Sequence, residues 1–425
     1  MTLSSALSTA VSGLTAQSLA LSTISKNIAN ASTTAYKTSV TDFQTLLTDS
    51  TGGASGGGVT ASSIQSMGQQ GQIATSATDT NVAIDGSGFF VVAGSATASA
   101  SDFVYTRDGS FAKDSNGNLV NDAGYYLEGF PTDPSGAIIT SNSSDLSNLT
   151  PINLSNIGGT AKATTQINMS ANLPANAAIG DTFTTSTTII DSLGVSHTIG
   201  QSWNKTAANA WTLTLADPTL TSNPAVTSGT LSPNTVSVTF DTSGVLASTN
   251  PTPVALAITG LSTGAAASAI TLNLGSAGKT DGITQFSSTS SATGIENPTF
   301  TQDGALYGQL TGVTIDTKGL VTASFDNGVK LPVYQIPLAT FANPNGLTAV
   351  TGSVYSQNQA AGNVSLRLPG DSSAGTLQAS ALEGSTTDIA GEFNRMIVAQ
   401  QAYSAASQVV TTVKSMFDTL TQAVR

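Results

Sequence analysis

Residues able to do chemistry are few in this sequence. His197 is the only histidine and cysteine is absent, which excludes disulfides and the usual histidine and cysteine zinc sites. A serine–histidine–aspartate triad would have to use His197, yet no Gly-x-Ser-x-Gly nucleophile elbow accompanies it. We therefore expect His197 to lie on the surface or in a turn. The sequence predicts no enzyme, no cofactor, and no catalytic or metal-ligating residue.

One loop imitates a calcium site. Asp114, Asn116 and Asn118 have the spacing of the first three ligands of a calcium-binding loop. However, Leu119 stands where that loop needs glycine, and Tyr125 stands where the bidentate glutamate belongs. The segment suits a β-hairpin turn better, because Asp and Asn side chains accept hydrogen bonds from turn amides.

The composition limits the class of partner. The 25 acidic residues outnumber the 13 basic ones, so the formal net charge is −12, whereas proteins that neutralise phosphate groups carry clustered basic residues. Nucleic acids and anionic membrane surfaces are therefore poor candidates. Charged residues make up only 9% of the chain, while Ser, Thr, Gly and Asn are abundant. This mixture favours β-structure with many turns.

The amino-terminal segment lacks the features of a secretory signal. No Lys or Arg precedes Lys26, and Ser and Thr interrupt every apolar run. We expect no cleaved signal peptide, and no stretch is apolar enough to predict membrane insertion. The protein should be cytosolic, or exported by a route that does not read such a signal.

Apolar residues at both ends recur at alternating steps of four and three, which is the spacing of a heptad seam. Such helices need a partner to bury the seam. Each could pack on its own globular domain, but no comparable run lies between them, so we predict a coiled coil of the two ends or of neighbouring copies. Ser385 and Asp388 fit a capping box before the second helix, and Glu392 interrupts its row. The predicted self-assembly seam comprises Leu3, Leu7, Leu14, Leu21, Ile24 and Ile28, and then Ile389, Met396, Tyr403, Val410, Val413, Phe417, Leu420 and Val424.

The interior alternates apolar residues with turn signals, as in a β-meander. Gly86-Ser87-Gly88 predicts a turn before a buried strand, and Tyr105–Phe111 and Asp114–Val120 predict successive hairpins. Strands are also expected at Thr182–Ile190 and Val236–Phe240. We predict an α+β fold that is mainly β, with discontinuous β-domains nested between the terminal helices. Its parts are paired helices at 1–31 and 386–425, an extended connector at 32–72, a discontinuous β-domain at 73–148 and 300–372, and an inserted outer β-domain at 149–299.

The amino-terminal motif resembles that of the bacterial flagellar axial proteins, the rod, hook and hook-associated subunits. One departure is Ala35, which stands where glycine is usual and tolerates a left-handed backbone less well. Lys26 also stands where a small or amide residue is common. The residues that carry the resemblance are Ser12, Gly13, Leu14, Asn27, Ile28, Ala29, Asn30, Tyr36 and Lys37.

Later segments extend the resemblance over nearly the whole chain. Asp85–Phe90, Tyr105–Phe111 and Ala381–Ser385 are similar to rod and hook proteins in general. Asp191–Thr198, followed by Trp211, is similar to the inserted outer domain of hook proteins. The resemblance thus favours a hook subunit over a distal rod or hook-associated protein. A Ser/Thr-rich surface adhesin would explain the β-rich middle but not the paired terminal heptads.

The resemblance implies a helical homopolymer that forms a flexible, curved tube, with the terminal helices inside and the β-domains outside. Such a tube would act as a universal joint that passes motor torque to the filament. The implied partners are further copies of the chain, the distal rod, the hook cap and hook–filament junction proteins, and the flagellar type III export apparatus. The implied location is the extracellular flagellar hook, reached without a cleaved signal peptide.

Overall fold

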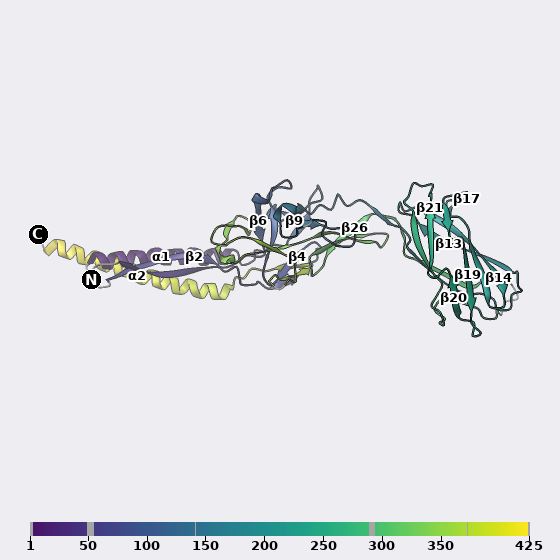
Figure 1. Cartoon of the computed structure of the whole chain (residues 1–425). Coiled ribbons are helices and arrows are strands. Elements are labelled where there is room, and N and C mark those ends of the chain that lie inside the picture. The colour runs from purple at the N-terminus through teal and green to yellow at the C-terminus, as the bar shows by residue number, and fades with distance from the viewer. Residues whose placement is uncertain (1–2, 49–54, 141, 289–293, 372, 424–425) are drawn as a thin grey trace. The chain divides into compact units, whose positions relative to one another are not determined.

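The computed structural model describes residues 3–48, 55–140, 142–288, 294–371 and 373–423. The chain divides into two compact units (Figure 1). Unit 2 is an insertion in the sequence of unit 1, and it differs from the predicted inserted domain, 149–299, at both ends. Unit 1 comprises Met1–Ile157, Val313–Ala323 and Leu331–Arg425, and unit 2 comprises Gly158–Gly312 and Ser324–Lys330.

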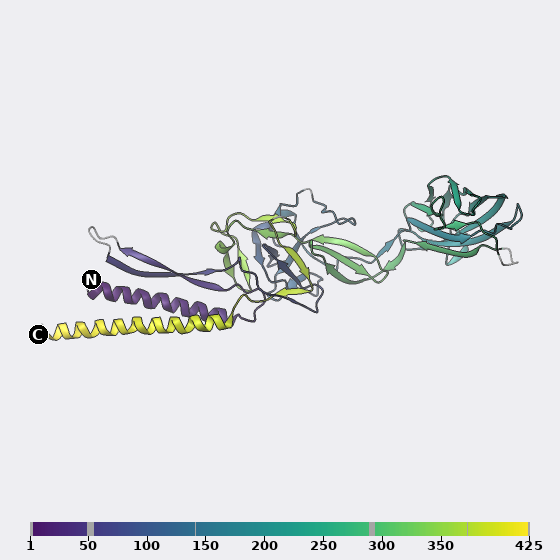
Figure 2. The same ribbon diagram turned by 90° about the horizontal axis from the view of Figure 1, so that it is seen from below.

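The two terminal helices lie side by side in unit 1, which confirms the predicted pairing (Figure 2). They are α1 (Leu3–Ala29) and α2 (Ile389–Ala423). The predicted capping box is wrong in detail, because α2 begins after Asp388, whose Oδ1 accepts a hydrogen bond from the Ala390 amide at 3.1 Å. In the described part of the chain, no helix is long and apolar enough to cross a membrane.

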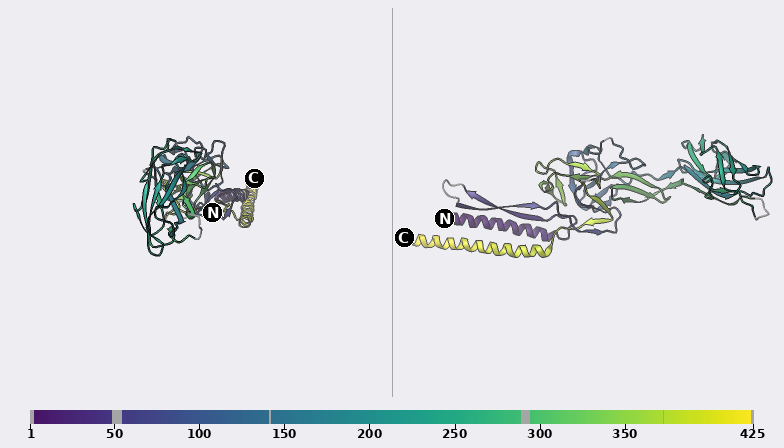
Figure 3. Two further views of the ribbon diagram at one scale, coloured as in Figure 1. Left: turned by 90° about the vertical axis from the view of Figure 1, so that its right-hand side faces the viewer. Right: turned by 60° about the horizontal axis from the view of Figure 1, so that its bottom comes forward.

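The predicted connector at 32–72 is largely a β-hairpin. Its strands, β1 (Ser39–Thr48) and β2 (Ser55–Gln65), pair antiparallel and pack along α1 (Figure 3). The backbone approaches the helix closely at Gly58, where φ is +102° and a Cβ would lie 2.6 Å from Ser12 Oγ. That oxygen also accepts a hydrogen bond from the Val59 amide at 3.1 Å. Gly58 of the glycine-rich stretch therefore provides close packing, where composition alone indicated a connector.

The β-structure of unit 1 is built around one antiparallel sheet whose strands differ in length. A predicted hairpin at Tyr105–Phe111 is wrong, since β6 pairs with β5 and β31, and β7 pairs with β8. The main path of the sheet runs β26 (Leu310–Ile315), β27 (Leu320–Phe325), β28 (Lys330–Gln335), β9 (Tyr126–Pro131), β5 (Phe89–Ala93), β6 (Phe103–Thr106), β31 (Val354–Ser356) and β30 (Thr348–Val350). Pairing with it are β7 (Phe111–Lys113), β8 (Leu119–Asn121), β10 (Thr150–Pro151), β29 (Leu338–Thr340) and β32 (Ser365–Arg367).

Two small antiparallel pairs link the ends of the chain to this sheet. β3 (Ile73–Thr75) pairs with β34 (Ala381–Glu383), and β4 (Val82–Asp85) pairs with β33 (Thr376–Ala379). The segment before α2 is therefore fixed against residues that follow the hairpin. The adjacent core is aromatic, with the rings of Phe89 and Tyr355 packed edge to face at 6.0 Å. Short 3-10 turns lie at Ala100–Asp102, Leu146–Asn148 and Pro344–Gly346.

Unit 2 is a sandwich of two sheets. One sheet contains β18 (Thr230–Ser232), β21 (Val254–Thr259), β22 (Ser268–Asn273), β12 (Gln166–Asn172), β23 (Ile283–Thr284) and β24 (Glu296–Gln302). The other contains β17 (Asn223–Thr227), β16 (Thr219–Leu220), β14 (Ser196–Ala207), β15 (Ala210–Leu215), β19 (Thr235–Phe240), β20 (Leu246–Asn250) and β13 (Thr182–Ile190). A separate pair joins β11 (Thr160–Lys162) to β25 (Ala305–Gly308).

The core of unit 2 follows from strict alternation along its strands. Every second residue of β19, β21 and β22, and of β14 up to Lys205, is buried, and the apolar side chains among them belong to one cluster between the sheets. Trp203 and Trp211 lie in that cluster with 0% and 1% exposure. The predicted strands at Thr182–Ile190 and Val236–Phe240 are confirmed by β13 and β19.

Candidate assembly interface

Alanines are prominent among the buried residues of the terminal helices within one chain. Because an alanine side chain is short, it lets the neighbouring backbone approach closely. Of the predicted seam, only Ile24 and Val413 are buried, and the half-buried members are Leu7, Leu14, Leu21, Ile28, Met396 and Val410. The other buried residues in the described part of the two helices are the alanines Ala10, Ala16, Ala20 and Ala399 and the polar residues Thr23, Asn27 and Glu392.

The rest of the predicted seam is exposed in a single chain. Ile389, Tyr403, Phe417 and Leu420 are 49%, 42%, 39% and 61% exposed. The Leu3 side chain and the whole of Val424 lie outside the described residues. Further large apolar residues of α2 are exposed beyond the seam, and they are Phe393, Ile397, Val398, Val409 and Met416. A helix that is apolar on most sides is normally buried on most sides, so pairing with α1 alone leaves α2 incomplete.

A groove of about 420 Å³ lies between α1, β1 and the first half of α2. Glu392 lies at this groove and is only 3% exposed. Its Oε1 accepts a hydrogen bond from the Arg395 guanidinium at 2.9 Å, whereas its Oε2 is buried and has no hydrogen-bond partner among the described residues. The apolar lining includes Ala20, Ile24, Val40, Phe43, Val398 and Ala402.

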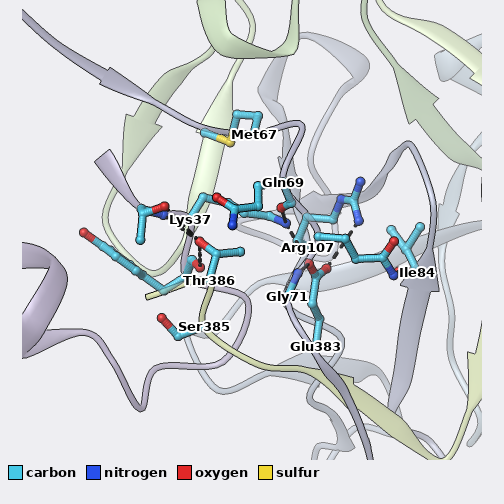
Figure 4. Close-up of polar contacts among 12 residues, drawn as sticks. Lys37, Met67, Gln69, Gly71, Ile84, Arg107, Glu383, Ser385 and Thr386 are labelled. Atoms are coloured by element: carbon cyan, nitrogen blue, oxygen red, sulfur yellow. Dashed lines mark hydrogen bonds and ion pairs between the residues drawn. The ribbon is translucent and has the colours of Figure 1, made fainter. Parts of the chain in front are cut away.

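Glu383 is the centre of a buried polar cluster formed by segments that include those after α1 and before α2 (Figure 4). Its Oε1 accepts hydrogen bonds from Lys37 Nζ at 2.6 Å and from the Gly71 amide at 2.7 Å. Its Oε2 accepts one from the Arg107 guanidinium at 3.3 Å. The side chains of Lys37 and Glu383 are 0% exposed and that of Arg107 is 5% exposed. This junction cluster, Lys37, Arg107 and Glu383, joins the segment after α1, the β-sheet and the strand before α2.

Two cations share one carboxylate in the junction cluster, and backbone carbonyls accept further hydrogen bonds from both, although Arg107 Nε has no partner among the described residues. Lys37 Nζ donates to the Gln69 carbonyl at 2.6 Å, and Arg107 donates to the Gly86 carbonyl at 2.7 Å. Burial lowers the pKa of Lys37 and that of Arg107, and the Glu383 carboxylate opposes both shifts. Such a network is stable only while every member is present.

The motif residues around Asn27 fix the hairpin to the end of α1. Asn27 Nδ2 donates to the Ser39 carbonyl at 2.8 Å, while its Oδ1 accepts from the Ser39 amide at 3.0 Å and from the Tyr36 hydroxyl at 3.1 Å. Asn30 Nδ2 donates to the Lys26 carbonyl at 2.8 Å and so ends the helix. These contacts give Asn27, Asn30 and Tyr36 a structural role within one chain.

Ala35 adopts the backbone conformation that favours glycine. Its φ is +55° and it is 1% exposed. Its amide donates to the Glu383 carbonyl at 2.8 Å, which holds it in place. By contrast, Gly13 lies within α1, and a Cβ there would meet nothing within 4 Å. Ala29 is exposed, so neither Gly13 nor Ala29 is explained by close packing within one chain.

Sequence reasoning missed Glu383, Arg107 and Glu392 as site residues. A signal was available, because charged residues are only 9% of the chain and Glu392 interrupts an apolar row. The partners could not be assigned, however, because Lys37 and Glu383 are 346 residues apart.

The expectation that His197 lies on the surface or in a turn is wrong. His197 is 0% exposed on β14, with Nε2 3.0 Å from Asp191 Oδ2 and Nδ1 2.6 Å from Ser228 Oγ. Thr263 also donates to Asp191 Oδ2, at 2.7 Å. Burial alone would raise the pKa of Asp191, but hydrogen bonds from His197, Thr263 and nearby amides lower it. Asp191 and Ser228 are each 1% exposed, so this arrangement offers no access to a substrate.

The calcium-like loop forms the predicted hairpin turn between β7 and β8. Asp114 Oδ1 accepts hydrogen bonds from the amides of Asn116 and Asn118 at 2.9 and 2.7 Å. Its Oδ2 accepts one from Asn118 Nδ2 at 3.1 Å. The carboxylate is thus used to order the turn. The Gly86-Ser87-Gly88 turn before the buried strand β5 is likewise confirmed, with positive φ at both glycines.

Paired terminal helices around a discontinuous β-region define the class of flagellar axial proteins, and family models match along the chain. They are described as flagella basal body rod protein (residues 7–37), flagellar hook protein FlgE/F/G D1 domain (83–176), flagellar basal body protein FlaE D2 domain (156–305) and flagellar basal body rod FlgEFG protein C-terminal (378–423).

Comparison with whole proteins narrows the class. The chain is 35% identical to the flagellar hook protein FlgE of Rhizobium meliloti, with 99% of each chain covered, and 33% identical to that of Brucella suis over the same shares. It is 31% identical to the FlgE of Salmonella typhimurium, with 97% of this chain and 98% of the relative covered. The chain therefore belongs to the flagellar hook protein family. A solved structure of Helicobacter pylori FlgE2 covers 73% of this chain and 100% of its own, at 15% identity and a TM-score of 0.45.

Proposed function

We propose that this chain is the structural subunit of the flagellar hook and polymerises through its terminal helices into a curved, flexible tube that transmits torque. The exposed apolar face of α2 carries the proposal, with Ile397, Val398 and Leu420 at 53%, 60% and 61% exposure. Burial of apolar surface is the main driving force of association, so further copies of the same region would complete the helix packing. Full-length similarity to hook proteins favours this role over a rod role.

The neighbours of such a tube follow from the family. We infer that the distal rod, the hook cap and the hook–filament junction proteins meet the ends of the polymer, and that the type III export apparatus delivers the chain outside the cell without a cleaved signal peptide. The β-units would face outward. Their neutral Ser, Thr and Asn surfaces would exchange contacts more readily than an interlocked apolar core when the tube bends.

The test is Phe417→Asp in the full-length chain, examined by negative-stain electron microscopy under polymerising conditions. We expect curved tubes from the unchanged chain and none from the variant, because the new carboxylate would be buried without a partner. Thr411→Asp, an exposed polar position on the same helix, is the matched control and should still form tubes. Tubes from Phe417→Asp, or melted β-units in that variant, would contradict the proposed interface.

A further inference from the structure

The groove between α1, β1 and α2 contains a feature that packing within one chain does not explain. Glu392 replaces an apolar residue in the row of α2, and its buried Oε2 has no hydrogen-bond partner among the described residues. A buried carboxylate oxygen without a donor is costly, and none of the polar side chains that share the groove lining donates to it within the described part of the chain. The missing donor is therefore sought outside the chain.

Three cations lie in the described parts of the terminal helices, namely Lys26, Arg395 and Lys414. Arg395 already donates to Glu392 Oε1 in the same chain. Val11 is the one large exposed apolar residue in the described part of α1, and it is not a neighbour of Lys26 on that helix. Lys414 differs, because Val410 and Phe417 lie one turn away on its own face.

Building on the proposed function, we propose that the second half of α2 from another copy fills this groove, with its Lys414 ammonium donating to the Glu392 carboxylate. The charges are complementary, and Phe417, one turn from the lysine, and Leu420, one turn further on, need apolar cover, being 39% and 61% exposed. The torsion that turns a glutamate carboxylate is broad, so Oε2 can rotate toward the groove. The Arg395 side chain is 60% exposed and so does not block this rotation by packing.

The same chain cannot make this contact. Glu392 and Lys414 are 22 positions apart on one helix, a span of about 33 Å. The groove and the lysine-bearing segment are different surfaces of unit 1, so the contact is head-to-tail. A polymer built in this way has a free groove at one end and a free lysine-bearing segment at the other. Contacts of this type propagate into open helical polymers. In Figure 2 and Figure 3, the last turns of α2 also extend beyond the start of α1.

Disulfide trapping gives a direct test, because the chain contains no cysteine. The double variant Glu392→Cys with Lys414→Cys is allowed to polymerise and is then oxidised. We expect a ladder of covalent multimers on non-reducing gels, since a disulfide needs Cα atoms within about 7 Å and the intrachain span is far greater. Mixing the two single variants should give dimers only. The control pair, Glu392→Cys with Lys113→Cys, should give no ladder.

Charge exchange tests the same contact without cysteine. Glu392→Lys and Lys414→Glu should each reduce polymer yield at least tenfold, and the double variant should restore it. Lys26→Glu should polymerise normally and should not rescue Glu392→Lys. Tubes that form but give neither ladder nor rescue would overturn the pairing alone. An unchanged chain that stays monomeric would overturn the proposed function, and the pairing with it.

Discussion

The junction cluster of unit 1 and the His197 cluster of unit 2 are both buried and polar, but they connect the chain over different distances. Lys37 and Glu383 are separated by 346 residues, whereas His197 is separated by 6 residues from Asp191 and by 31 from Ser228. The first cluster joins the two ends of the molecule to its β-structure. The second fixes a turn and a loop inside a sandwich that already has a continuous apolar core.

The two units also differ in what would still stabilise them if their buried polar cluster were lost. Around His197 the apolar core of unit 2 includes both tryptophans, so the sandwich has other sources of stability. Around Glu383, the strands β3 and β34 are three residues each, and the segment before α2 is otherwise held by the short pair β4–β33 and by hydrogen bonds such as that from the Thr38 amide to Thr386 Oγ1. Loss of a contact should therefore cost more at the junction than in unit 2. The following substitutions test that difference.

The largest effect is expected from Glu383→Gln. It leaves Lys37 and Arg107 buried without a carboxylate, which typically costs about 3–5 kcal/mol. We expect unit 1 to unfold at a much lower denaturant concentration, followed by circular dichroism at 222 nm, because both described long helices belong to that unit. Tryptophan fluorescence should not shift, because Trp203 and Trp211 both lie in unit 2.

The control for Glu383→Gln is Asp122→Asn, which removes an exposed carboxylate from a turn of the same unit. Its circular dichroism transition should stay close to that of the unchanged chain. If Glu383→Gln behaves like this control, the junction cluster is not a principal support of unit 1.

An intermediate effect is expected from Asp191→Asn in unit 2. Loss of the charged acceptor for His197 and Thr263 should cost about 1–3 kcal/mol, measured by tryptophan fluorescence. The pH dependence has a defined sign. Because the folded-state pKa of Asp191 is lowered from its ordinary 3.8, its contribution is present above pH 3.8 and is lost as the pH falls through the folded value.

The dependence of stability on pH in the acid range distinguishes this effect from a simple loss of packing. Asp191→Asn should be less sensitive to acid than the unchanged chain, since the titrating group is gone. Asp241→Asn, at the turn between β19 and β20, provides a comparison outside the His197 cluster. Equal acid sensitivity in Asp191→Asn and the unchanged chain would show that Asp191 does not contribute as expected.

The smallest effect is expected from Ala35→Gly, and its sign is opposite. A left-handed backbone costs a residue with a Cβ about 1–2 kcal/mol, and glycine regains most of this while losing some chain entropy. We expect unit 1 to become more stable by up to about 1 kcal/mol in thermal unfolding. The matched change Ala112→Gly, at an exposed strand position without positive φ, should destabilise it.

The terminal helices and many strands could be predicted because their signals are local. The seam from Leu7 to Ile28 and the alternation in β13 each depend on residues a few positions apart. The hairpin β1–β2 could not be predicted, since Gly58 serves close contact with Ser12 on α1, and a composition count cannot distinguish that from a connector.

The buried polar clusters lay beyond sequence reasoning for a related reason. A single histidine in a strand gives no sign that Ser228 will contact its ring, or that Thr263 will contact its partner Asp191. In the same way, the heptad pattern identified some of the apolar residues of α2 but not which face remains uncovered. The uncovered face depends on how α1 and the hairpin pack. The buried α1 residues Ala16 and Ala20 are small and give only a weak apolar signal in the sequence.

The distance along the chain between Lys37 and Glu383 also sets an order of folding. All segments of unit 2 lie between Gly158 and Lys330, so the sandwich can form while the last part of the chain is still on the ribosome. Unit 1 cannot close its junction until Glu383 and then α2 have been made. Contacts of such long sequence separation form slowly, because loop closure must precede any gain. The region that carries the assembly surface is therefore the last part of each newly made chain to become competent.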